Sequence, residues 1–353
     1  MSAAPGSRIR PRRALRPSPE PPPARPRSAA PARAEERPPS HGWRVVAAKE
    51  TADHLGSVRL YVLAVVLTIA GVAAIYSMSQ VIRGAAADAT GYRSLFLALF
   101  TGGADPVPAF VTLVGFLAPL LGIAFGFDAV NGERADRTLP RLLAQPIYRD
   151  DVVNGKFVAG LLAVATVLVA VVAFVAGIGL IRIGIPPTVE DVVRLVLWVA
   201  LTVVYVGFWL AFATFCSVAF RRAASSALVA IALWIGLTLF GVLLATLVAN
   251  LLSPPGSTSA DQLANLRLRE TLERLSPDTL YLQATRAILD PRVTGFGIDA
   301  ALASQSQGAL PSTVLSLPQS VLVVWPQVVA LVALTVVSFG LAYVTFLRQE
   351  VRA

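Results

Sequence analysis

The sequence predicts an all-α integral membrane protein with six transmembrane helices. Of its 353 residues, 55% are hydrophobic and 14% are charged, whereas a soluble globular protein carries roughly 25% charged residues. Six apolar runs are long enough to cross a bilayer, which takes about 20 residues of helix. None of them contains a charged residue, and a charge at mid-membrane costs roughly 2.5 to 3.5 kcal/mol. We therefore expect spans at residues 60–82, 106–127, 157–181, 195–220, 223–252 and 321–347, within a domain of residues 59–350.

The first 40 residues differ in composition from the rest of the chain. They are rich in Pro, Arg, Ala and Ser and have too few apolar residues to build a core, so we expect a disordered tail at 1–40. The tail has no apolar stretch of the kind that marks a secretory signal peptide. An Arg-rich transit peptide is a weaker interpretation, because such peptides form amphipathic helices and this segment is rich in proline.

The distribution of positive charge predicts the orientation. Residues 1–59 carry twelve Lys and Arg and residues 128–156 carry five, whereas the first and third loops on the other side carry two each. Because positive loops stay on the cytoplasmic side, we expect a multi-pass protein of the cytoplasmic (inner) membrane with both termini in the cytoplasm. The net charge of +9 lies mostly in the tail. A basic tail beside a lipid membrane explains this charge, so we expect no nucleic-acid partner.

Residues 41–58 precede the first span and have the pattern of an amphipathic helix. Apolar residues recur at roughly helical spacing, with charged residues between them. We interpret this segment as an interfacial helix that lies along the membrane surface, and a soluble helix packed on a partner is the alternative. The apolar positions are Trp43, Val46, Ala47, Leu55 and Val58, and the charged ones are Arg44, Lys49, Glu50 and Asp53.

The outer side is predicted to carry short helices. The apolar segment Ser94–Phe100 is too short to cross, so we place it as an outer-surface helix ahead of the second span. In the outer loop 253–320, Ser276-Pro277 separates two helical patterns, and Pro277 suits the first turn of the second. We expect both to lie on the outer membrane surface. The first has one leucine face, made of Leu263, Leu266, Leu272 and Leu275.

Several kinds of chemistry have no motif in this sequence. The only Gly-Lys pair, Gly155-Lys156, lacks the other residues of an ATP-binding P-loop. The single cysteine, Cys216, excludes an intrachain disulfide, and both histidines precede the first span, so we expect no metal site. The spans also lack ionisable groups of the kind that proton-coupled carriers and membrane-embedded enzymes use. Energy for transport must therefore come from elsewhere.

A block of mixed charge, residues 128–156, lies between the second and third spans. It contains five acidic and five basic residues, and this neutral balance fits a protein partner better than anionic lipid. Thr138 can cap a short helix that ends at Gln145-Pro146, and Asp150 or Asp151 can cap a second helix. The block therefore predicts a helix–turn–helix hairpin in the cytoplasm, with a solvated loop as the alternative.

The block also resembles a known signature. The pattern F-D-x-V-x-G-E-R-x-x-x-T-L-x-x-L-L-x-Q-P-I-x-R-x-x-x-x-x-G-K, at residues 127–156, is similar to that of ABC-2 type permeases. Within that family it most resembles the branch that includes the permease for nitrous-oxide-reductase maturation. The resemblance covers about residues 43–350. Arg137 and Pro140 depart from the pattern and could change the shape of the hairpin.

The resemblance implies a membrane subunit that is not itself an enzyme. Such a subunit pairs with a second permease copy, as a homodimer or heterodimer, and with ABC ATP-binding subunits that hold ATP and Mg, so no cofactor is expected in this chain. The block would be the coupling helix. An ATPase-coupled scaffold without substrate flux is the alternative function. The implied coupling residues are Glu133, Arg134, Thr138, Leu142, Pro146, Arg149, Gly155 and Lys156, with Trp43, Lys49 and Glu50 in the interfacial helix.

Overall fold

The computed structural model describes residues 42–84, 95–135, 148–256, 258–293, 295–297 and 315–348. All of them belong to one compact unit, Pro38–Ala353. The described residues form helices and no strand, which confirms the all-α fold class. The expected tail 1–40 and the tip of the expected hairpin, 136–147, lie outside the described residues.

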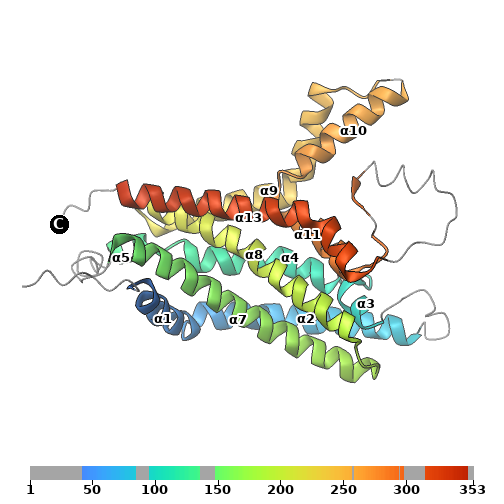
Figure 1. Ribbon diagram of the computed structural model, residues 1–353, viewed down its shortest axis with the longest axis horizontal. Helices are drawn as coiled ribbons and strands as arrows, with labels where there is room; N and C mark the ends of the chain where they lie inside the picture. Colours follow the sequence, from blue (N-terminus) through green and yellow to red (C-terminus); the bar gives the residue numbers. More distant parts are fainter. Residues whose placement is uncertain are drawn as a thin grey trace, which may run out of the picture. The chain divides into compact units, whose positions relative to one another are not determined.

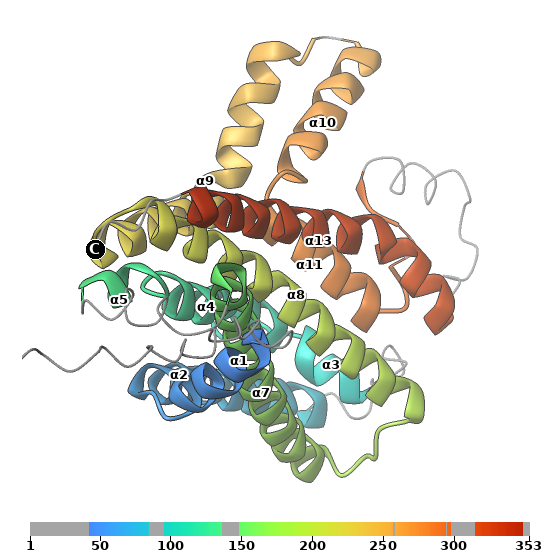
Figure 2. The same ribbon diagram turned by 60° about the vertical axis from the view of Figure 1, so that its left-hand side comes forward.

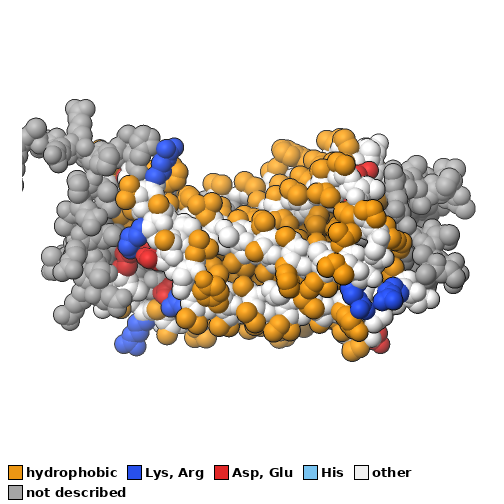
Figure 3. Space-filling view, turned by 90° about the horizontal axis from the view of Figure 1, so that it is seen from below, with side chains coloured by type: hydrophobic (Ala, Val, Ile, Leu, Met, Phe, Trp, Pro, Cys, Tyr) orange, Lys and Arg blue, Asp and Glu red, His pale blue; other side chains and the backbone are white. Residues whose placement is uncertain are grey.

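Within the described residues, six helices are long and apolar enough to cross a membrane, as predicted. Hydrophobic side chains cover the middle of the face seen in Figure 3, and charged side chains gather at its two ends. The second helix begins at Phe110 rather than at 106, because Pro106 and Pro108 disfavour the helical conformation of the residues that precede them. The six helices are α2 (Val58–Gly84), α4 (Phe110–Gly126), α7 (Arg149–Ile183), α8 (Val189–Ala219), α9 (Ala223–Leu252) and α13 (Leu317–Arg348).

Helix α8 lies at the centre of the packing. It contacts α4, α7, α9 and α13, and Figures 1 and 2 show it running between them. Its largest side chains, Trp198, Tyr205 and Trp209, are completely buried. The helix therefore gives the other spans a common surface on which to pack.

Two glycines let α4 approach α8 more closely than other residues would. A Cβ atom on Gly122 would lie 2.6 Å from the carbonyl oxygen of Val206, and one on Gly126 would lie 2.7 Å from that of Leu210. The two glycines form a G-x-x-x-G pair, which brings helix backbones together in membranes. The spacing of the pair is visible in the sequence, but it does not show which helix packs on the two glycines.

Two helices expected on the outer membrane surface are instead packed among the spans. Helix α3 (Leu95–Thr101) buries Phe96 through Phe100, and α11 (Pro277–Leu289) contacts α13, α8 and α4. The placement was wrong because α11 finds apolar partners on three long helices, which bury its own apolar face. As predicted, Pro277 occupies the first turn of α11.

Helix α10 (Ser259–Glu273) forms as expected, but it does not bury the predicted leucine face. Leu266 and Leu275 are exposed, and the one buried residue of the helix is Asn265. The Asn265 Nδ2 donates to the Oδ1 of Asn250 at 3.0 Å and to the carbonyl of Ser253 at 2.7 Å. A polar contact with the end of α9 therefore sets which face of α10 is covered.

Arg194 holds α8, α11 and α13 together at the end of the bundle opposite α1 (Gly42–Leu55). Its side chain is only 1% exposed. The guanidinium donates to the carbonyl of Ile288 in α11 at 2.7 Å and to the Oγ of Ser320 in α13 at 3.1 Å, and it pairs with Glu190 on its own helix. The predicted span starts at residue 195, whereas α8 begins earlier, at Val189, where Thr188 and Asp191 form a capping box.

Candidate functional site

A close contact joins α1 to the first turns of α7. A Cβ atom on Gly155 would lie 2.7 Å from the Val46 side chain and 2.9 Å from the carbonyl oxygen of Trp43. Figure 1 shows α1 and the start of α7 at the same end of the bundle as α5 (Asn131–Ala135). The helix of the expected interfacial segment is thus present, and its apolar residues Val46 and Ala47 are buried. Its position along a membrane surface stays a prediction.

Lys156 links three separate elements at this contact. Its Nζ lies 3.0 Å from the Oε2 of Glu50 on α1 and 2.7 Å from the Oε1 of Glu133 on α5. The Lys156 side chain is 8% exposed, and those of Glu50 and Glu133 are 12% and 20% exposed. Because one ammonium contacts two carboxylates at low exposure, we expect each of the three charges to depend on the others. We call Glu50, Glu133 and Lys156 the charge cluster.

A more exposed ring of charge surrounds the charge cluster. Lys49 bridges Glu50 and Asp53 on the outside of α1, and Arg59 of α2 pairs with Asp128. These groups and His54 line a cavity of about 440 Å³. Burial lowers the pKa of His54, whose ring lies 4.7 Å from that of Phe125, so the imidazole is neutral at pH 7.

Helix α5 is attached to the end of α8 by hydrogen bonds from its backbone to a serine side chain. The N–H groups of Val130 and Asn131 donate to the Oγ of Ser217, at 3.0 and 3.1 Å. Arg134 reaches toward the carbonyl of Val218 at 3.5 Å. Ser217 thus caps the start of a helix that lies far from it in sequence. A lone serine in an apolar run carries no signal that reveals this role.

Among known protein families, the model of ABC-2 family transporter proteins matches residues 44–351, which is most of the chain. The chain belongs to the ABC-2 transporter family. It is therefore a membrane permease component of an ABC transporter, a kind of subunit that is generally not an enzyme and that works with an ATP-binding partner. A comparison with curated proteins gives no match.

The remaining signature residues of this ABC-2 protein fall in two groups. Thr138, Leu142 and Pro146 lie outside the described residues, so the expected hairpin is not tested there. Arg149 is exposed and is the first residue of α7. The expected caps Asp150 and Asp151 were placed wrongly, because α7 begins earlier and they lie in its first turn. There their charge still suits the positive end of the helix.

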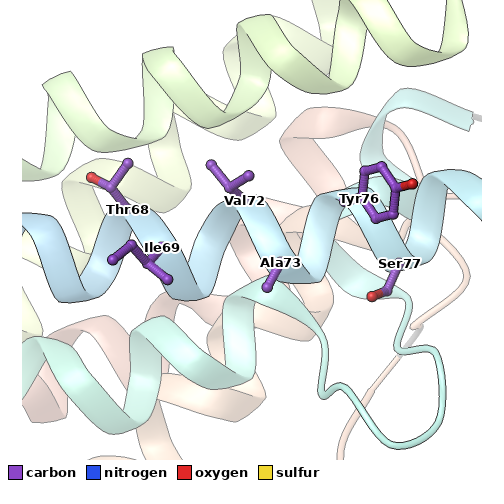
Figure 4. Close-up of a pocket in the computed structure, with 6 residues that line it drawn as sticks. All are labelled: Thr68, Ile69, Val72, Ala73, Tyr76 and Ser77. Atoms are coloured by element: carbon purple, nitrogen blue, oxygen red, sulfur yellow. The ribbon is translucent and has the colours of Figure 1, made fainter.

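Among the described residues, a second cavity of the ABC-2 protein lies far from this chemistry. It is a shallow apolar groove of about 460 Å³ that runs along α2 (Figure 4). Every lining residue belongs to one helix, and Ile69 and Tyr76 are exposed. A groove of this kind on a single transmembrane helix suits contact with lipid chains. Its lining is Thr68, Ile69, Val72, Ala73, Tyr76 and Ser77.

Gly155→Ala is expected to push α1 away from α7 in this ABC-2 protein. The added methyl group collides with Val46 and with a backbone oxygen, so overpacking should lower the free energy of unfolding by about 1 to 3 kcal/mol. Denaturant titration of the purified protein measures this loss. Gly177→Ala on the same helix is the matched control, because a Cβ there meets nothing within 4 Å. Equal effects from the two substitutions would contradict the close contact.

Proposed function

We propose that this chain is the transmembrane permease subunit of an ABC transporter driven by a separate ATP-binding subunit that docks on residues 128–156. One observation carries the proposal: both described ends of this block are fastened to different transmembrane helices. Glu133 in α5 binds Lys156 in α7, and Ser217 of α8 caps the start of α5. Movement of the block would therefore reach α7 and α8 together.

The charge cluster supports a mechanical role for this end of the molecule. Lys156 connects the block to α1 through Glu50, and the missing methyl group of Gly155 keeps α1 tight against α7. A force applied between Ala135 and Tyr148 would meet a rigid base rather than a slack loop. Rigid packed elements transmit such displacements because they do not deform continuously.

The finer features of the assembly are part of the same proposal. We infer that ATP and Mg bind to the partner subunit and that two permease copies form the passage, as a homodimer or a heterodimer. The charge asymmetry of the loops supports the cytoplasmic (inner) membrane with both termini in the cytoplasm. The likeness of the 127–156 signature supports the nitrous-oxide-reductase maturation branch.

Arg149→Glu is expected to weaken recruitment of the ATP-binding subunit by about tenfold, or about 1.4 kcal/mol. Arg149 is exposed where the block meets α7, so reversing its charge changes the docking surface and removes no described ion pair. Glu133 is a poorer target because its loss would also break the charge cluster. The measurement is co-purification of the separately encoded ATPase with the tagged permease.

Arg83→Glu is the control for this experiment, because Arg83 is exposed at the other end of α2. Unchanged recruitment by both variants would remove Arg149 from the coupling assignment. Flux of substrate into vesicles that contain the assembled complex separates transport from a scaffold. ATP hydrolysis with no flux of any candidate substrate would favour the scaffold.

A further inference from the structure

A helix carbonyl in the middle of the packed bundle has lost its normal partner. In α4 the carbonyl of Gly115 faces position 119, and Pro119 has no N–H to donate to it. The Tyr205 hydroxyl of α8 lies 3.2 Å from this oxygen. An unpaired carbonyl costs several kcal/mol where water is excluded. The Gly115 carbonyl is therefore stabilised by the hydrogen bond that the Tyr205 hydroxyl donates.

A carboxyl group competes for the same proton. Asp278 lies in the first turn of α11, and its Oδ1 is 3.4 Å from the Tyr205 hydroxyl. The Tyr281 ring stacks on that of Tyr205 at 4.3 Å, and its hydroxyl lies 3.1 Å from the Oγ1 of Thr202. When Asp278 is ionised, two acceptors share one donor. When Asp278 is protonated, its O–H can donate to Tyr205, whose own proton is then free for Gly115.

We propose that Asp278, Tyr205 and the Gly115 carbonyl form a proton-binding site, and that the bound proton holds the first turn of α11 against α4 and α8. The other end of α11 is held by Arg194, which donates to the carbonyl of Ile288 at 2.7 Å. One end of the helix is thus fixed and the other depends on a proton. We call α11 seated when its first turn packs as in the structure.

No cation competes for this role in the described part of the chain. The elements packed on α11 are α13, α8, α4 and α3, and of these α3 and α4 have no titratable side chain. Tyr205 and Tyr281 are the titratable groups that face Asp278. The other titratable groups on α8, α11 and α13 are Glu190, Asp191, Arg194, Cys216, Arg286, Tyr343 and Arg348. Those of α10 and its C-cap, which precede α11 in the chain, are Asp261, Arg267, Arg269, Glu270, Glu273 and Arg274.

The direction of the pH dependence follows from the environment of Asp278. Burial raises its pKa from 3.8 to about 6, although the hydrogen bond from Tyr205 opposes the shift. Seating is therefore strongest below pH 3.8 and weakens as the pH rises through about 6. About two pKa units correspond to a change of about one hundredfold in the seating equilibrium. In the proposed orientation, the pH on the outer side sets this state.

Hydrogen exchange of residues 277–289 in the full-length protein tests the proposal. Rates are measured from about pH 4 to about pH 8 and divided by the intrinsic rates of an unfolded chain at each pH. We expect protection to fall as the pH rises from about 3.8 to about 6 and to level off above about 6. The fall should be absent in Asp278→Asn, whose amide donates to Tyr205 as the protonated acid would, and unchanged in Asp290→Asn at the other end of α11.

Pro119→Ala gives a second, independent readout. It restores an N–H to the Gly115 carbonyl, so the Tyr205 proton becomes available to the ionised Asp278 and the midpoint should move to lower pH. Infrared spectra of the protonated carboxyl follow the same titration without relying on exchange. An unshifted midpoint in Pro119→Ala, or a pH-dependent fall that persists in Asp278→Asn, would overturn the proposal.

Discussion

Lys156→Met is expected to lower the free energy of unfolding by about 3 kcal/mol and to abolish ATP-driven transport. Methionine has a similar length but no charge, so Glu50 and Glu133 would lose the ammonium that lies between them. Both carboxylates have little exposure to water, which cannot replace the lost ammonium. Denaturant unfolding of the purified protein measures the loss of stability, and vesicle flux measures the loss of transport.

The other lysine of the chain supplies the control. Lys49 also bridges two carboxylates, but its side chain is 66% exposed, so Lys49→Met should cost under about 0.5 kcal/mol. A triple variant that carries Glu50→Gln, Glu133→Gln and Lys156→Met should recover part of the stability, because it leaves no uncompensated charge. Equal losses from the two lysine variants would show that burial does not make the charge cluster important.

Gly122→Ala is expected to separate α4 from α8 and to lower the free energy of unfolding by about 2 to 3 kcal/mol. The new Cβ would lie 2.6 Å from the Val206 carbonyl oxygen and 2.8 Å from the Leu210 nitrogen. Both are backbone atoms, so a side-chain rotation cannot relieve the collision. Thermal unfolding of the purified protein, followed by tryptophan fluorescence, reports the loss because Trp209 lies beside Gly122.

Gly241→Ala tests whether the effect comes from packing rather than from glycine itself. A Cβ at Gly241 in α9 meets nothing within 4 Å, and alanine is the better helix former, so the variant should be as stable as the parent or slightly more stable. If Gly122→Ala were equally harmless, the close approach of α4 to α8 would be refuted.

The transmembrane spans were predictable from the sequence because hydrophobic transfer adds up along a local stretch of chain. All six were found, and the largest shifts of their ends lie at helix starts, as at Phe110, Arg149 and Val189. For the candidate site, the sequence predicted which residues take part but not how they are arranged. Glu133, Lys156 and Glu50 were singled out by the resemblance, but nothing in the sequence paired them with one another.

The helices α3 and α11, which were expected on the outer surface, show what a local residue pattern does not predict. Helix α11 has the residue pattern of an amphipathic surface helix, yet its Leu280 and Tyr281 are buried against three long helices. Helix α10 has a similar pattern, but its Leu266 is exposed. The residue pattern of a short helix shows that one face is apolar, but it does not show what covers that face.

The sequence by itself determined the membrane fold, the number of spans and the charged block between the second and third of them. The tertiary structure alone decided which residues meet: Lys156 with Glu50 and Glu133, and Asp278 with Tyr205. The physical reason is that insertion into a bilayer depends on the sum of local side-chain transfer energies, whereas a contact depends on the direction in which each helix face points. Gly122 and Gly241 are the same residue in similar apolar helices, and only packing makes one of them indispensable.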